Sequence, residues 1–87
     1  MDEHRLDGNA AGGVLGEIFT FETTTAQVAC ANCGAVWRVG QTMVYMHEMG
    51  TILRCATCDS VLIRVARGPG RHWLDMRGVR CLQVEEA

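Results

Sequence analysis

Four of the five cysteines in the chain fall into two pairs with the spacing of metal ligands. Each pair is a C-x-x-C motif, and 21 residues (34–54) separate the two motifs. A two-residue gap lets both sulfurs of one tight turn face the same ion. Two such turns, brought together, offer the four thiolates of a closed structural zinc site. The sequence therefore predicts one structural Zn²⁺ bound by Cys30, Cys33, Cys55 and Cys58.

Other chemistry is open to the same four cysteines. Iron in a rubredoxin-like site uses the same donors, so spacing alone does not separate it from zinc. Rubredoxin cores tend to be rich in aromatic residues, whereas this chain has two Trp, one Tyr and two Phe, which favours zinc. A thioredoxin-like redox pair needs a helix directly after its C-x-x-C motif, and disulfides need an oxidising compartment. Here strand-like segments follow both motifs.

The segments around the cysteines indicate a β-rich fold that holds two metal-binding turns. β-branched and apolar residues lead into and out of knuckles at 30–34 and 55–59, which places each knuckle at the tip of a hairpin. Gly34 supplies the backbone freedom that such a turn often needs after its second cysteine. We expect a zinc ribbon with rubredoxin-like knuckles and about six short antiparallel strands. Seven strand-like segments can supply them: 23–29, 35–39, 42–46, 51–54, 61–67, 71–76 and 79–84.

An apolar residue at every fourth position predicts a short N-terminal helix over residues 6–19, packed on the ribbon. Four glycines lie inside that segment and lower its intrinsic helix stability, so the helix should form only when docked. The glycines would also allow close approach to the surface beneath. Residues 1–5 are polar and are expected to fray, and residues 20–84 would form the β ribbon.

Length and composition bound the remaining possibilities. With 87 residues, 48% of them hydrophobic and 21% charged, the chain has room for one globular domain, 1–87. It shows no apolar run long enough to span a membrane and no secretion signal, which predicts a cytoplasmic protein with reduced thiols. A core this small is a marginal source of stability. We therefore expect Cys33→Ser, or removal of the metal, to leave the ribbon unfolded.

Charge raises nucleic-acid binding as an alternative function. All eight basic residues are arginine, and several of them surround His72 and Trp73 near the C-terminal end: Arg67, Arg71, Arg77 and Arg80. Arginine contacts phosphate, and an aromatic ring can stack on a base. The formal net charge of −2 and a pI near 5.8 disfavour this reading, because nucleic-acid modules are usually basic.

The remaining candidate residues have plainer interpretations. Cys81 shares a strand face with Val79 and is expected to be a small core residue. His47 and His72 are expected to be solvated or partly packed rather than ligands. The segment 37–49, with three methionines and Tyr45, is the most plausible surface for a protein partner.

No catalytic constellation is visible, and a closed four-thiolate site leaves no position for substrate. The sequence thus predicts a non-enzymatic, metal-stabilised binding module. A protein is the expected partner. Nucleic-acid binding is the first alternative to this function, and a rubredoxin-like iron electron carrier is the second.

Two further elements carry a family resemblance that covers nearly the whole chain. They are the opening Leu-Asp-Gly-Asn-Ala of residues 6–10 and the closing Gly-Arg-His-Trp-Leu-Asp of residues 70–75. Together with the knuckles, they resemble a family of small bacterial zinc-ribbon proteins of unknown function. The resemblance implies that the four paired cysteines are the metal ligands, and it implies no established activity. It modestly favours a role as the partner of an oxidoreductase.

Overall fold

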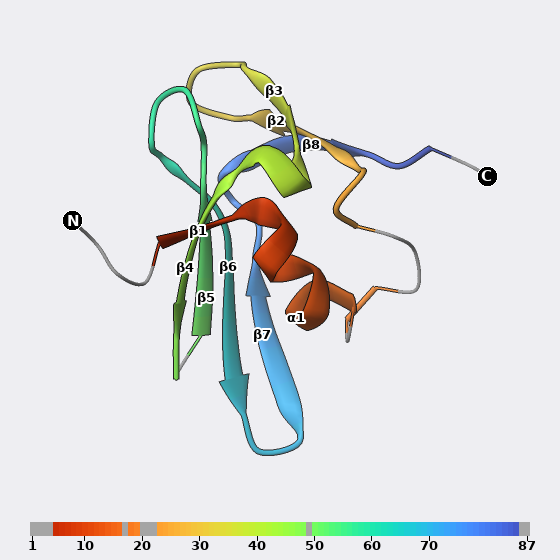
Figure 1. Ribbon diagram of the computed structural model, residues 1–87, viewed down its shortest axis with the longest axis vertical. Coiled ribbons are helices and arrows are strands. Elements are labelled where there is room, and N and C mark those ends of the chain that lie inside the picture. Colours follow the sequence, from red (N-terminus) through yellow and green to blue (C-terminus); the bar gives the residue numbers. More distant parts are fainter. Residues whose placement is uncertain (1–4, 17, 20–22, 49, 86–87) are drawn as a thin grey trace.

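The computed structural model describes residues 5–16, 18–19, 23–48 and 50–85, which form two antiparallel sheets and a short α-helix (Figure 1). The larger sheet has the strand order β1-β4-β5-β6-β7, and the smaller has the order β3-β2-β8. The strands are β1 (Arg5–Asp7), β2 (Gln27–Cys30), β3 (Val36–Arg38), β4 (Met43–His47), β5 (Gly50–Arg54), β6 (Val61–Gly68), β7 (Arg71–Asp75) and β8 (Val79–Gln83). The helical elements are the 3-10 helix η1 (Gly8–Ala11), the α-helix α1 (Gly12–Gly16) and the 3-10 helix η2 (Val39–Gln41).

Each of the seven segments predicted as strands overlaps an observed strand, and both predicted hairpins are present. β2 pairs with β3, β5 pairs with β6, and each knuckle lies between the strands of its own hairpin. The count of about six strands was too low, because the described residues form eight. The eighth, β1, lies where the sequence predicted helix and pairs with β4.

The predicted helix over residues 6–19 is wrong in its extent. α1 spans only Gly12–Gly16, η1 precedes it, and Leu6 and Asp7 belong to β1. The glycines explain the difference, because each weakens a helix by about 1 kcal/mol relative to alanine. After α1, the backbone N–H groups of Ile18 and Phe19 both donate to the carbonyl of Leu15 in a turn. Of the residues predicted to fray, Arg5 lies in β1, and residues 1–4 fall outside the described part of the chain.

Alternation along the strands gives the large sheet two distinct faces. Val44 pairs with Leu53, which pairs with Ile63, and all three side chains are buried. We call the face that carries them the inner face. Ala11 of η1 and Leu15 of α1 join the same core, together with residues of the small sheet. The opposite face of the large sheet, the outer face, carries the alternate residues.

Close packing of η1 depends on the smallest side chain. A Cβ atom on Gly8 would lie 1.7 Å from the carbonyl oxygen of Val39 in η2, which no side chain can accommodate. The expectation that a glycine in this segment permits close approach is confirmed at this position. No helix in the described part of the chain has the length and apolar character needed to cross a membrane.

A β-bulge in the small sheet overturns the prediction that Cys81 belongs to the core. Ala29 pairs with Cys81, whereas Cys30 pairs with Val79, so Arg80 is an extra residue on β8. The extra residue shifts the alternation of side chains. Val79 and Leu82 therefore pack against the core, and Cys81 is exposed.

Candidate metal centre

The two knuckles have the same backbone hydrogen bonds, although they belong to different sheets. In the first, the N–H of Gly34 donates to the carbonyl of Cys30 at 3.0 Å. In the second, the N–H of Asp59 donates to the carbonyl of Cys55 at 2.9 Å. The first cysteine of each knuckle also donates its own N–H to the carbonyl five residues later, at 2.9 Å in the first and 2.8 Å in the second. Both C-x-x-C motifs therefore fold into one type of turn.

The residue after the second cysteine is left-handed in both knuckles. Gly34 has a φ of 79°, which glycine adopts freely. Asp59 occupies the equivalent position with a φ of 64°, which is uncommon for residues that carry a side chain. The guanidinium of Arg54 donates to the carbonyl of Asp59 at 2.9 Å and supports this conformation from the preceding strand.

The four predicted cysteines converge on one point. All four Sγ atoms lie within 4.8 Å of one another. The distances from Cys30 to Cys58 and from Cys33 to Cys55 are both 3.7 Å, and each joins the two knuckles. Sulfurs bound at about 2.3 Å to one zinc ion in a regular tetrahedron would lie about 3.8 Å apart. The spacing thus fits four ligands of one ion, and it is far too long for disulfide bonds.

Polar groups surround the sulfurs and connect the two knuckles. The Ser60 hydroxyl lies 3.1 Å from Cys58 Sγ and 3.3 Å from Cys30 Sγ, so it touches one sulfur of each knuckle. The Asn32 side-chain amide donates across the site to Cys58 Sγ at 3.5 Å. Such donors stabilise thiolate and orient it towards an ion. Neither residue was predicted from the sequence, although small polar residues within and just after a C-x-x-C motif were the available signal.

A tryptophan braces the second knuckle from the neighbouring hairpin. The indole Nε1 of Trp37 on β3 donates to Thr57 Oγ1 at 3.0 Å, and the backbone N–H of Thr57 lies 3.4 Å from Cys55 Sγ. Trp37 was predicted to be part of a partner-binding surface. In the structure its indole nitrogen contacts the second knuckle.

The cysteines differ in acidity because their surroundings differ. Hydrogen bonds from Asn32 and Ser60 lower the pKa of Cys58 to about 6. The backbone N–H of Ala35 favours the thiolate of Cys33, but desolvation and the three neighbouring sulfurs outweigh it and raise its pKa to about 12. Four adjacent thiolates repel one another unless a cation lies among them. The donor set therefore suits a single borderline-soft cation, and its geometry does not distinguish zinc from other metals.

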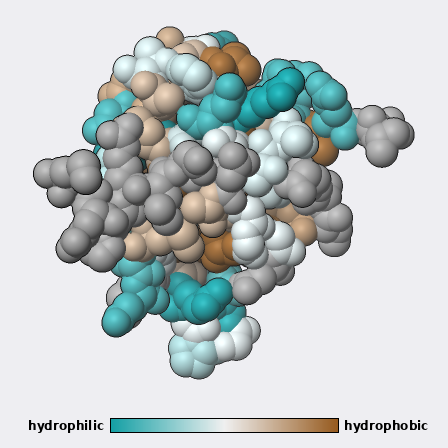
Figure 2. Space-filling model, in the orientation of Figure 1, coloured by the Kyte–Doolittle hydropathy of each residue, from teal (hydrophilic) through white to brown (hydrophobic). Residues whose placement is uncertain are grey.

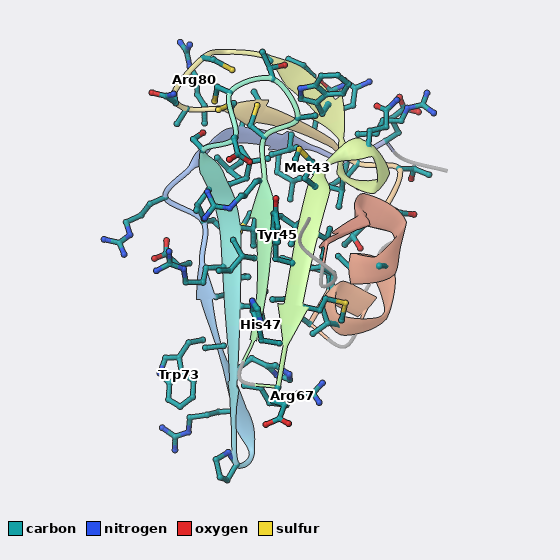
Figure 3. All side chains as sticks on the ribbon, turned by 60° about the vertical axis from the view of Figure 1, so that its left-hand side comes forward. Met43, Tyr45, His47, Arg67, Trp73 and Arg80 are labelled. Atoms are coloured by element: carbon teal, nitrogen blue, oxygen red, sulfur yellow. The ribbon has the colours of Figure 1, made fainter. Side chains whose placement is uncertain are left out.

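The arginines singled out in the sequence do not gather into one surface. Arg67 lines a hollow between α1 and the inner face, whereas Arg71 lies on the outer face with its partner Gly68. Arg77 is ion-paired with a neighbouring aspartate. Arg80 lies beside the knuckles, and Arg67 lies at the opposite end of the large sheet (Figure 3). Cys81, His47 and His72 are not members of the sulfur cluster.

Fold and site together describe a small β-rich domain with two sheets that meet at a four-cysteine cluster. The whole chain, residues 1–87, matches a family of unknown function (DUF6510), and the chain belongs to that family. Searches of curated proteins and of solved structures found no match.

Proposed function

We propose that the chain is a zinc-ribbon module in which one structural Zn²⁺ joins the two sheets, and that the domain binds a protein partner without catalysing a reaction. The observation that carries the metal assignment is the pair of 3.7 Å distances between sulfurs of different knuckles. They equal, within about 0.1 Å, the edge of a zinc–thiolate tetrahedron. Cys30 and Cys55 are fully buried and belong to the core, so the ion would lie where the sheets pack.

A structural role suits this site better than a catalytic one. Catalytic zinc sites keep one position for water or substrate, whereas four cysteines close the coordination shell. Zinc has no redox chemistry, and the polar groups near the sulfurs bridge the knuckles. Each of these features favours an ion that holds two hairpins in a fixed relation. The surface of the domain is then left to provide the function.

Metal analysis of protein purified without added metal tests the assignment. We expect one zinc per chain by elemental analysis and native mass spectrometry, and a colourless solution. Cys58→Ser should lose the ion, and Cys81→Ser is the matched control because Cys81 is an exposed cysteine outside the cluster. A red, reducible protein with one iron per chain would instead identify the bound metal as iron. A metal-free chain with an unchanged thermal transition would refute a structural metal altogether.

A further inference from the structure

The outer face of the large sheet carries an aromatic, apolar and cationic surface. Its register places two rows of side chains across the strands. One row is Tyr45, Ile52, Arg64 and Asp75, and the other is His47, Gly50, Ala66 and Trp73. Figure 3 shows Tyr45 and His47 on this side of the sheet, with Trp73 at its β7 edge. Figure 2 shows the molecule from the α1 side, where the strongly hydrophobic residues among those drawn in colour lie in small separate areas.

Trp73 is the exposed anchor of this surface. Its side chain is 54% exposed, although it lies in regular strand structure. A Cβ atom on Gly68 would lie 2.5 Å from Cζ3 of the indole, so the ring rests directly on the backbone of β6. The guanidinium carbon of Arg71 lies 5.9 Å from the ring centroid. The ring is therefore held in one place, which reduces the entropy lost when a partner binds.

A hollow of about 360 Å³ lies beside the tryptophan on the same sheet. Ile52, Ala66 and Gly50 form its apolar floor, and His47 and Arg64 are among the residues that line it. Ala66 contributes only a methyl group to the floor. Gly50 is required for the strand pairing itself, because a Cβ atom there would lie 2.4 Å from the carbonyl oxygen of Val65 on β6. The hollow has room for one apolar side chain of a ligand.

One arginine lines the hollow and two more lie on the same face of the sheet: Arg64 at the hollow, and Arg71 and Arg54 against aromatic rings. Arg64 is exposed, Arg71 lies over the tryptophan, and Arg54 lies 5.7 Å from the ring centroid of Tyr45. The one aspartate in these two rows, Asp75, is neutralised by its ion pair with Arg77. The face is thus locally cationic on a chain whose formal net charge is −2. A ligand that matches it carries carboxylates around an apolar side chain.

We propose that the outer face binds an acidic peptide segment of a protein partner, with one apolar side chain in the hollow and carboxylates on Arg64 and Arg71. This inference rests on the proposed function and names the surface and the chemistry of the partner. Single-stranded nucleic acid fits less well. Tyr45 and Trp73 lie three strands apart and in different rows, so at least about 14 Å separates them, which is too far for neighbouring bases to stack on both. One face of the Trp73 ring is also already covered by β6.

Peptide binding to the full metal-loaded chain tests this proposal. The probe is a short fluorescent peptide in which one leucine and one phenylalanine are flanked by glutamates. We expect saturable binding that weakens with salt, and amide NMR shifts confined to β4–β7. Replacing the glutamates by glutamine, or the apolar pair by serine, should each remove most of the affinity.

Variants locate the site. Trp73→Ala and Arg64→Glu should each weaken peptide binding by about tenfold or more, as expected for an aromatic anchor and a charge reversal. Arg67→Gln is the matched control, since this exposed arginine lines the hollow on the α1 side. Metal content is measured on every variant, so a binding loss with one zinc retained is separable from failure of the metal site.

Three results would overturn the proposal. Absence of binding at millimolar peptide, or shifts centred away from β4–β7, would remove the site. Tighter binding of oligothymidylate to the same face would assign it to nucleic acid. Outer-face shifts that depend on protein concentration without peptide would assign it to a second copy of the chain.

Discussion

Ser60 is the side chain that best shows how the two knuckles depend on each other. It follows the second knuckle directly in the chain, yet its hydroxyl lies within 3.3 Å of a sulfur from each knuckle. A hydroxyl has one proton, so it can donate fully to only one thiolate at a time. The residue would hold the Cys30 and Cys58 sulfurs together in the orientation that an ion requires.

Ser60→Ala should therefore weaken metal binding without abolishing it. Loss of a group that orients a metal ligand typically costs about 10–100-fold in affinity. Competition with a chromophoric chelator measures the change, and Ser60→Thr, which keeps the hydroxyl, should stay close to wild type. Equal affinities for the alanine and wild-type chains would show that the hydroxyl has no role at the site.

Two glycines with open space around them should respond to alanine in opposite directions. A Cβ atom would meet nothing within 4 Å at Gly34 or at Gly13, but only Gly34 has a positive φ. Gly34→Ala should cost about 1–2 kcal/mol of stability, because the left-handed conformation is unfavourable for alanine. Gly13→Ala, inside α1, should gain up to about 1 kcal/mol. Urea unfolding at fixed free zinc measures both, and the same sign for the two variants would contradict this reasoning.

The Asp75–Arg77 pair gives a pH dependence with a definite sign. Hydrogen bonds from Arg77 lower the pKa of Asp75 from 3.8 to about 2. A lowered pKa in the folded state adds stability above the ordinary carboxyl pKa, and that stability is lost as the pH falls towards about 2. At pH about 4 the wild-type carboxylate should stay ionised, whereas in Arg77→Gln it should be partly protonated. Carbon NMR of the Asp75 side chain measures the ionised fraction, and identical titrations would rule out the coupling.

Among the secondary-structure elements, those that the sequence predicted correctly are set by residues close together in the chain. The C-x-x-C spacing and the flanking β-branched segments predicted both hairpins and the convergence of the four cysteines. Pairing between distant strands decided the rest. The bulge at Arg80 arises from the pairing of β8 with β2, so its reversal of Cys81 and Leu82 is not visible in a periodic pattern. The glycines of residues 8–16 weaken a long helix, and pairing of β1 with β4 places Leu6 and Asp7 in the large sheet instead of the helix.

The bulge makes Cys81 chemically distinct from the other four cysteines. It is exposed, and it lies outside the sulfur cluster. A maleimide reagent should modify the metal-loaded protein once, at Cys81, and should modify five cysteines after denaturation with a chelator. Peptide mapping by mass spectrometry identifies the site. Labelling of Cys33 at the same rate in the loaded protein would show that exposure outweighs metal binding in protecting a thiol.

For the whole molecule, a structural ion would change both stability and charge. Binding of structural zinc to small peptides contributes about 10–16 kcal/mol near neutral pH, which is comparable to the stability of an entire domain. The core also includes two of the cysteines themselves, Cys30 and Cys55. Four thiolates add −4 and zinc adds +2, so the formal charge of −2 becomes −4. The cationic outer face would then differ in sign from the net charge of the domain by a larger margin than in the metal-free chain.

Removal of the metal should therefore unfold the chain. We expect the cooperative thermal transition of the loaded protein to disappear after chelation and dialysis, and to return when one equivalent of zinc is restored. Calorimetry and far-ultraviolet circular dichroism measure this together. Persistence of the full transition in the chelated protein would show that the two sheets are held by their core alone.

The placement of the cysteine cluster also has a mechanical consequence. β1 is an edge strand of the large sheet and β8 is an edge strand of the small sheet, and each knuckle belongs to a different sheet. Tension applied between β1 and β8 would load the β1–β4 and β2–β8 pairs first, and the sulfur cluster would carry the load between the sheets once those edge strands had separated. An ion bound there would therefore keep the two hairpins joined after the edge strands had been pulled off.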